Sequence, residues 1–211
     1  MVIKIFFEDK PVFLCDEITP VIHEFIHHPD AIFIDEISTP AIKSLLHEIV
    51  KPAFHAGILW YNNIEKLKKS FFKHFTIIQA AGGLVKNEQN EILLIFRRGK
   101  WDLPKGKNDG DEIPRECAVR EVKEETGLQK IKVGKKICTT YHTYAEFGKH
   151  ILKETEWFEM KAASEQKLTP QHDEDIEKIE WVNELDINEK LNNSFPLIAD
   201  VILSSGINIK A

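Results

Sequence analysis

The chain has 211 residues, of which 43% are hydrophobic and 29% charged, a balance typical of a folded globular protein with a sizeable core. This length exceeds the usual size of about 150 residues per domain, so more than one unit is expected. The formal net charge of −6 excludes a general electrostatic attraction to nucleic acids or anionic membranes. Phosphate-bearing ligands must therefore be met by local cations.

The three cysteines, Cys15, Cys117 and Cys138, lie far apart and form no C-x-x-C pair. A small and odd number of separated cysteines predicts reduced thiols in a cytoplasmic protein. The simplest role of each is packing in the core. The first residues, MVIKIFF, lack a charged segment followed by a long apolar run, so we expect no signal peptide. No apolar run approaches the roughly 20 residues that span a bilayer.

Residues 1–72 are predicted to form a small α/β module, because short apolar runs alternate with helical patterns. The expected strands are Val2–Phe7, Val12–Cys15, Ala31–Ile34 and His55–Trp60, and the expected helices are Thr19–His28, Pro40–Val50 and Asn63–Phe72. No glycine-rich phosphate loop follows any of these strands. The role of the module stays unknown, with homodimer formation and covering of an active site both open.

A second domain is predicted over residues 74–206, where strands surround a single acidic helix. The expected strands are Phe75–Val85, Glu91–Phe96, Lys130–Tyr144, His150–Met160 and Lys178–Val182, followed by a closing helix at Pro196–Leu203. Pro196 at the start of that helix and Gly206 after it fit the usual helix boundaries.

The segment Gly106–Leu128 reads GKNDGDEIPRECAVREVKEETGL and predicts a loop followed by a helix. Pro114 falls in the first helical turn and Gly127 just past the end, as is usual for a helix. Three glutamates, Glu121, Glu124 and Glu125, share one face at i, i+3 and i+4. Like charges so placed destabilise a bare helix, and a hard divalent cation supplies the compensating partner.

This segment resembles the Nudix box of MutT-like hydrolases, G-x5-E-x7-R-E-U-x-E-E-x-G-U, in which U is aliphatic. Every defined position is filled, by Gly106, Glu112, Arg120, Glu121, Val122, Glu124, Glu125, Gly127 and Leu128. The resemblance implies an α/β (α+β) fold, the Nudix αβα sandwich with a mixed sheet, here preceded in the chain by the small α/β module. It also implies a Mg²⁺-dependent pyrophosphohydrolase, with Mn²⁺ as an alternative ion, that cleaves a nucleoside diphosphate linked to another group X.

The resemblance also implies roles for the box residues. Glu121, Glu124 and Glu125 would be the metal ligands, with the Gly106 carbonyl as a fourth. Arg120 and Glu112 are expected to pair with each other and to hold the loop against the helix. The general base is either a box glutamate or an acid from the loop 171–175, in which Glu174 is our choice. The alternative for this loop is an exposed acidic turn without a catalytic role.

Residues upstream of the box indicate how a phosphate chain is bound. Arg97, Lys105 and Lys107 are candidate phosphate ligands, with solvated loop cations as the alternative. Trp101 is a candidate for stacking on a base, and a packed loop anchor is the alternative. The form W-x-L-P-K-G-K resembles Nudix enzymes that act on diadenosine polyphosphates and on damaged nucleoside triphosphates.

Residues downstream of the box favour the diadenosine polyphosphate group. ADP-ribose enzymes typically carry a proline there, whereas the first proline after Leu128 is Pro170. Dinucleoside polyphosphate enzymes tend to carry a tyrosine, and Tyr144 takes that position; a core tyrosine is the alternative. Sanitation of oxidised nucleoside triphosphates and hydrolysis of ADP-ribose or nucleotide sugars remain the other substrate hypotheses.

Two features of the sequence bear on other classes of protein. His23, Glu24 and His27 spell the zincin motif H-E-x-x-H, with His47 or Glu48 as a third ligand, but surface histidines on an amphipathic helix explain them as well. A non-catalytic nucleotide sensor is the second alternative, although such proteins often lose box carboxylates and none is missing here. The acidic chain shows no basic recognition helix, which argues against DNA binding.

Overall fold

Two compact units make up the chain, for which a computed structural model describes residues 1–209. Unit 1 contains Met1–Ile78 and Tyr141–Lys153, and unit 2 contains Gln79–Thr140 and Glu154–Ala211. The expected division at residues 72–74 lies close to the first of these boundaries. The tip of a later hairpin, which we placed in the second domain, is part of unit 1, because its pairing partner lies near the N-terminus.

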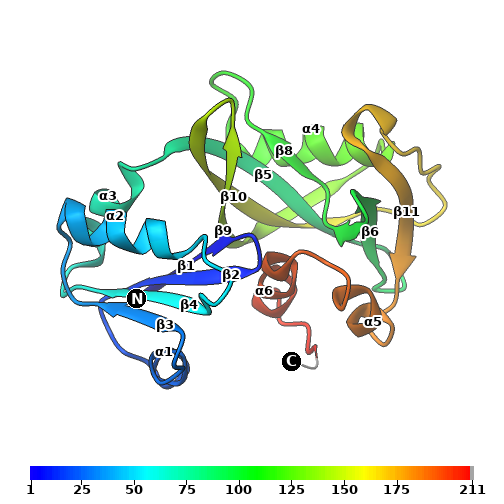
Figure 1. Cartoon of the computed structure of the whole chain (residues 1–211). Coiled ribbons are helices and arrows are strands. Elements are labelled where there is room, and N and C mark those ends of the chain that lie inside the picture. The colour runs from blue at the N-terminus through cyan, green and yellow to red at the C-terminus, as the bar shows by residue number, and fades with distance from the viewer. Residues whose placement is uncertain (210–211) are drawn as a thin grey trace. The chain divides into compact units, whose positions relative to one another are not determined.

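Unit 1 is a mixed sheet with helices on both faces (Figure 1). Its strand order is β9-β1-β2-β4-β3, in which β1 and β2 are antiparallel and β2, β4 and β3 are parallel. The elements are β1 (Val2–Phe7), β2 (Lys10–Cys15), α1 (Pro20–Ile26), β3 (Ala31–Ile34), α2 (Thr39–Glu48), β4 (Ala56–Trp60) and α3 (Ile64–Phe72).

The alternation of side chains along β2 divides the core of unit 1 between the two faces. Val12 and Leu14 join a cluster that contains Leu45 of α2 and Leu67 of α3. Phe13 and Cys15 point the other way and join a cluster with Ile22 of α1. Successive strand residues face opposite sides, so a strand buried on both faces reads as the continuous apolar run seen in the sequence.

The helices of unit 1 begin at residues that cap them. The side chains of Thr19, Ser38 and Asn63 accept hydrogen bonds from backbone N–H groups in the first turns of α1, α2 and α3. Such caps satisfy donors that have no partner inside the helix. They fix where the three helices begin.

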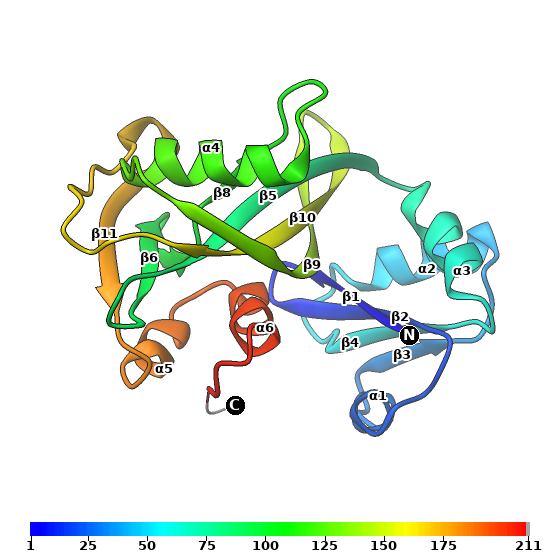
Figure 2. The ribbon, with the colours of Figure 1, turned by 180° about the vertical axis from the view of Figure 1, so that it is seen from behind.

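Unit 2 is an αβα sandwich. Its strand order is β11-β6-β5-β10-β9, and the short strands β7 and β8 pair with β6 and β5. Helix α4 lies on one face of this sheet and α6 on the other, and both views agree on this (Figures 1 and 2). The bounds are β5 (Thr76–Lys86), β6 (Ile92–Arg97), β7 (Lys100–Asp102), β8 (Lys105–Lys107), α4 (Pro114–Thr126), β9 (Lys132–Glu146), β10 (Lys149–Lys161), η1 (His172–Glu174), β11 (Ile176–Val182), α5 (Ile187–Leu191) and α6 (Pro196–Ser204).

The core of unit 2 fixes α4 against the sheet. Cys117, Ala118 and Val122 of α4 pack on Ala81 of β5 and Met160 of β10, all buried. The predicted strands and helices of both units are present, and the predicted fold class is confirmed. The elements β7, β8, η1 and α5 were not predicted. Within residues 1–209, every helix is too short or too polar to cross a membrane.

Candidate active site on helix α4

Helix α4 begins and ends where the sequence predicts. Pro114 occupies the first turn, and Gly127 caps the end with a φ of 79°, a left-handed conformation that favours glycine. A side chain at Gly127 would also meet Thr169, whose Cβ would lie 2.9 Å from the added carbon. The helix is therefore fixed in length and in its position beside the loop that follows β10.

The three glutamates of the helix differ strongly in exposure. The side chain of Glu125 is 1% exposed, that of Glu121 13% and that of Glu124 49%. Glu125 turns toward β6 and β8, whereas Glu121 and Glu124 turn toward Arg120. The set combines one fully buried carboxylate, one that is largely buried and one that is exposed.

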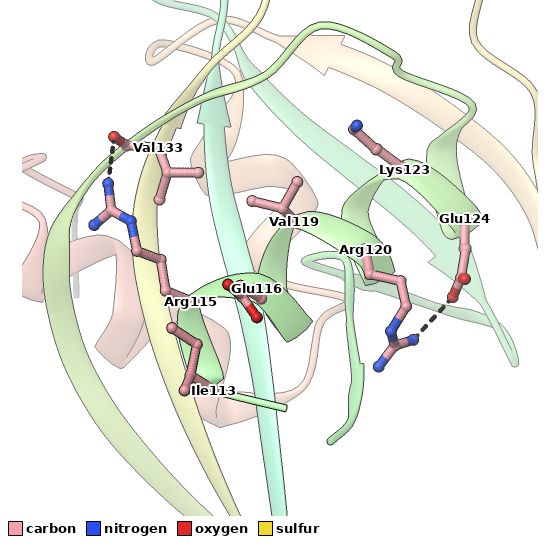
Figure 3. Close-up of a pocket in the computed structure, with 8 residues that line it drawn as sticks. All are labelled: Ile113, Arg115, Glu116, Val119, Arg120, Lys123, Glu124 and Val133. Atoms are coloured by element: carbon pink, nitrogen blue, oxygen red, sulfur yellow. Dashed lines mark hydrogen bonds and ion pairs between the residues drawn. The ribbon is translucent and has the colours of Figure 1, made fainter. Parts of the chain in front are cut away.

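Arg120 donates hydrogen bonds to three carboxylates, and the carboxylate of Asp109 lies 3.7 Å from its Nη2. Its Nε and Nη2 donate to the two oxygens of Glu112 at 3.1 and 2.8 Å, the ion pair expected from the sequence. Its Nη1 also donates to Glu121 at 2.7 Å and to Glu124 at 3.0 Å, the contact drawn in Figure 3. The hydrogen bonds from Arg120 lower the pKa of Glu112 and raise that of Arg120 itself. Arg120 further donates to the Lys107 carbonyl at 2.9 Å, which ties β8 to the helix.

Glu125 is held from two directions. Its Oε2 accepts the backbone N–H of Lys105 at 2.8 Å, and its Oε1 accepts Nη1 of Arg97 at 3.2 Å. Burial raises the pKa of this carboxyl to about 7, against the lowering effect of the nearby cations. The other end of the Arg97 guanidinium, Nη2, lies 3.6 Å from Oε2 of Glu174. Arg97 therefore links the buried box glutamate to the exposed candidate base in η1.

Gly106 leaves room for the carboxylate of Glu121, which lies against it. A Cβ built at Gly106 would be 2.0 Å from the carboxylate of Glu121, so an added side chain would have to displace that carboxylate. Gly106 belongs to β8 and pairs with Ala81 of β5, and the Cys117 thiol lies 3.8 Å from its carbonyl oxygen. The first glycine of the box thus lets an acidic side chain reach the backbone of the loop.

Two candidate substrate ligands, Trp101 and Lys105, have other partners in the structure. Trp101 is 8% exposed and packs against Phe96, with Nζ of Lys190 4.3 Å from its ring centroid. This is the packed anchor that we gave as the alternative to base stacking. Lys105 is 8% exposed, and its Nζ pairs with Asp102 at 2.5 Å, so it is neither a solvated loop cation nor directed at a ligand.

The remaining two candidates lie in different units. Lys107 is exposed at the end of β8, beside Arg120. Tyr144 belongs to the hairpin tip of unit 1, where its ring stacks on His142 with a centroid separation of 6.0 Å. The residues around α4 that could bind a ligand within unit 2 are therefore Arg97, Lys107 and the box side chains.

The donor set suits magnesium, although its side chains do not converge in this structure. Within residues 1–209, no three His, Cys, Asp or Glu side chains stand close enough to hold a metal as placed. The available donors are carboxylate oxygens, which Mg²⁺ prefers. The Arg120 guanidinium lies between Glu121 and Glu124 and neutralises them, which is the role that a bound ion would take. The residues therefore fit a divalent cation, provided that these two side chains turn away from Arg120.

A pocket of about 650 Å³ lies beside the box and was not foreseen from the sequence (Figure 3). Arg120 and Glu124 belong to its lining, which also includes Ile113, Arg115, Glu116, Val119, Lys123 and Val133. The only signal in the sequence was an apolar residue, Ile113, directly before the helix, where it is 54% exposed. The pocket places apolar surface next to the accessible glutamate.

Comparison with known proteins identifies the family. The profile of the NUDIX domain matches residues 76–201, which is more than half of the chain. A putative 8-oxo-dGTP diphosphatase of Bacillus subtilis is 49% identical over 51 residues, 23% of this chain and 34% of the relative. The mRNA-decapping enzyme subunit 2 of Arabidopsis thaliana is 32% identical over 104 residues, 46% of this chain and 28% of the relative. The m7GpppN-mRNA hydrolase of Saccharomyces cerevisiae is 28% identical over 141 residues, 64% of this chain and 14% of the relative.

Among solved structures, a C. elegans Ap4A hydrolase complex aligns with a TM-score of 0.49 at 20% identity. The alignment covers 61% of this chain and 95% of that chain. A MutT protein from Methanosarcina mazei aligns with a TM-score of 0.47 at 25% identity, over 64% of this chain and 98% of the other. The chain spans less than half the length of each curated relative named above, so those proteins share one segment with it. On the match over residues 76–201, this chain belongs to the Nudix family.

Proposed function

We propose that this protein is a divalent-cation-dependent hydrolase that cleaves a phosphoanhydride bond in a nucleoside diphosphate linked to a second group. One observation carries the proposal: Glu121 and Glu124 surround a single positive charge, and Glu125 is buried beside them on the same helix turn. Like charges so close together on a helix repel each other, and Arg120 offsets this repulsion in the metal-free protein, where a bound divalent cation would take over that role. The family match supplies the reaction class.

The chemistry follows from the charge on the substrate. Water must attack a phosphorus atom that anionic oxygens shield, and bound Mg²⁺ supplies charge neutralisation and a water of lowered pKa. Glu121, Glu124 and Glu125 would hold that ion. Arg120, held by Glu112, ties the backbone of β8 to the helix, so the loop that carries Gly106 stays in place while the glutamates turn toward the ion.

Glu174 is our candidate for the general base. It is exposed in η1, and the contact through Arg97 keeps it near the box. The test is the pH–rate profile of Glu174→Gln, with Asp173→Asn, an exposed neighbour, as the matched control. The proposal predicts loss of the acidic limb in Glu174→Gln alone. A profile like that of the unaltered protein removes Glu174 from the mechanism and leaves a box glutamate as the base.

For the substrate we propose a dinucleoside polyphosphate, in which a phosphate chain bridges two nucleosides. The W-x-L-P-K-G-K form before the box supports this class, and so does the relative named m7GpppN-mRNA hydrolase, whose name describes a triphosphate between two nucleosides. Oxidised nucleoside triphosphates are the second candidate, because the most identical segment among the relatives described belongs to a putative 8-oxo-dGTP diphosphatase.

A product screen separates these substrates. Diadenosine tetraphosphate, a capped dinucleotide, 8-oxo-dGTP and ADP-ribose are each incubated with the full chain, with Mg²⁺, Mn²⁺ or EDTA, and the products are resolved by mass spectrometry in ¹⁸O-labelled water. The proposal predicts the highest kcat/KM for one of the first two and no turnover in EDTA. Binding without turnover of any of them would favour the nucleotide sensor instead.

A further inference from the structure

Two histidines of unit 1 face each other on α1, far along the chain from the box. His23 lies in α1 and His27 is its C-terminal cap, so they stand one helical turn apart. Both side chains are exposed, and their Nε2 atoms are 3.2 Å apart. The zinc-peptidase reading of this H-E-x-x-H segment lacks support, because no third ligand joins the pair among residues 1–209.

The separation of the two nitrogens matches that of two ligands on one ion. Imidazole nitrogens bind Zn²⁺ at about 2.0–2.1 Å, so two of them at angles of about 90–110° lie about 2.8–3.4 Å apart. The ring planes meet at 74° with centroids 4.4 Å apart, so the rings are inclined edge to face and not stacked in parallel. The arrangement therefore costs little reorganisation when an ion is bound.

The nearby histidines have other contacts. The rings of His28 and His55 stack at 3.7 Å, and His28 Nδ1 accepts the backbone N–H of Asp30 at 3.2 Å. His23 and His27 are therefore the two histidines of this group whose ring nitrogens face one solvent-exposed point, at which an ion could bind. That position lies at the C-terminal end of α1, where the helix dipole favours a positive charge.

We propose that His23 and His27 form a two-imidazole binding site for a divalent transition metal of the zinc class, distinct from the box. The ligands are nitrogens, which suit Zn²⁺, Ni²⁺ and Cu²⁺ and not Mg²⁺. In the metal-free pair the Nε2–H of one ring donates a hydrogen bond to Nε2 of the other. When an ion binds, the donor ring loses this proton and takes one up at its own Nδ1, so that both Nε2 lone pairs become ligands. Water completes the coordination. The site needs none of the box residues and does not depend on the proposed hydrolase activity.

The test is calorimetric titration of the full chain with ZnCl2 in excess Mg²⁺, which occupies carboxylate sites. His23→Ala and His27→Ala should each weaken Zn²⁺ binding at least about tenfold, because even loss of a supporting contact to a ligand costs that much. His47→Ala, an exposed histidine of α2, is the matched control and should bind as the unaltered protein does. All three variants should keep Mg²⁺-dependent turnover.

A spectroscopic measurement assigns the ion to the pair directly. Long-range ¹H–¹⁵N spectra of the imidazole rings should show Zn²⁺ shifting the Nε2 resonances of His23 and His27 together. Equal Zn²⁺ affinity in the unaltered protein, His23→Ala and His27→Ala would overturn the proposal. So would shifts confined to His28 and His55.

Discussion

Removing the guanidinium of Arg120 should destabilise the protein in a way that magnesium partly reverses. Arg120 donates to three carboxylates, and each charge-assisted hydrogen bond contributes about 1.5–3 kcal/mol. Its side chain is 26% exposed, so screening reduces the total. We expect Arg120→Gln to lower the free energy of unfolding by about 2–4 kcal/mol in EDTA.

Magnesium should restore part of this loss, because the ion and Arg120 compete for Glu121 and Glu124. At about ten times its dissociation constant, an ion that binds only the folded state adds about 1.4 kcal/mol. The variant lacks the competing cation, so it should gain more from Mg²⁺ than the unaltered protein does. Urea denaturation followed by fluorescence, with and without Mg²⁺, gives both free energies.

Arg115→Gln is the matched control on the same helix. Arg115 donates to the carbonyls of Val133 and Gly134 at 2.9 and 2.8 Å, so the stability that it contributes should not respond to Mg²⁺. An equal gain from Mg²⁺ in Arg120→Gln and in the unaltered protein would refute the reasoning, since the carboxylates would then not share a binding position with the ion.

The same variant should change how stability depends on pH. Arg120 lowers the pKa of Glu112 in the folded state, so this contact stabilises the protein above the unfolded-state pKa of about 4.3. The stabilisation is lost as the pH falls through the lowered folded-state pKa. The difference in unfolding free energy between the unaltered protein and Arg120→Gln should therefore shrink below about pH 4.3.

Three further substitutions test separate parts of the site. Glu124→Gln should reduce kcat at least about a hundredfold. Its melting temperature should not fall, because the glutamine side chain can still accept a hydrogen bond from Arg120 and the repulsion by Glu121 and Glu125 is relieved. Glu116→Gln on the same helix should retain turnover, and near-normal kcat in Glu124→Gln would remove its metal role. Gly106→Ala should displace the Glu121 carboxylate, which would lie 2.0 Å from the new Cβ, and so lower kcat. Because the end of that side chain can move, the free energy of unfolding should fall by less than the roughly 1–3 kcal/mol typical of an overpacked core. Trp101→Ala should cost about 3–5 kcal/mol of stability while KM stays the same, and a large rise in KM would restore the base-stacking role.

Local signals account for the elements that the sequence predicts. A helix boundary depends on residues within one turn of it, such as the caps Ser38 and Asn63 and the glycine that ends α4. Such a boundary can therefore be predicted without knowledge of the fold. The short strands β7 and β8 carry no such signal. A three-residue strand shows no periodicity, and its pairing depends on strands distant in sequence, such as β5 with β8.

Contacts between distant segments were the part that the sequence could not predict. Ile5 of β1 pairs with Tyr141 of β9, which brings the hairpin tip into unit 1. The pairing of Arg120 with Glu112 followed from the resemblance, but its contacts with Glu121 and Glu124 depend on side-chain conformations that the spacing leaves open. The burial of Lys105 likewise follows from Asp102, a partner that no motif marked.

The central claim is that the glutamates of α4 close around a divalent ion beside a phosphate bridge. A crystal structure with Mg²⁺ and a non-hydrolysable dinucleoside polyphosphate tests it most directly. The account predicts an ion about 2.0–2.1 Å from oxygens of Glu121, Glu124 and Glu125, with Arg120 still on Glu112. Density for the nucleotide with all three glutamates in their metal-free positions, and no ion among them, would contradict it.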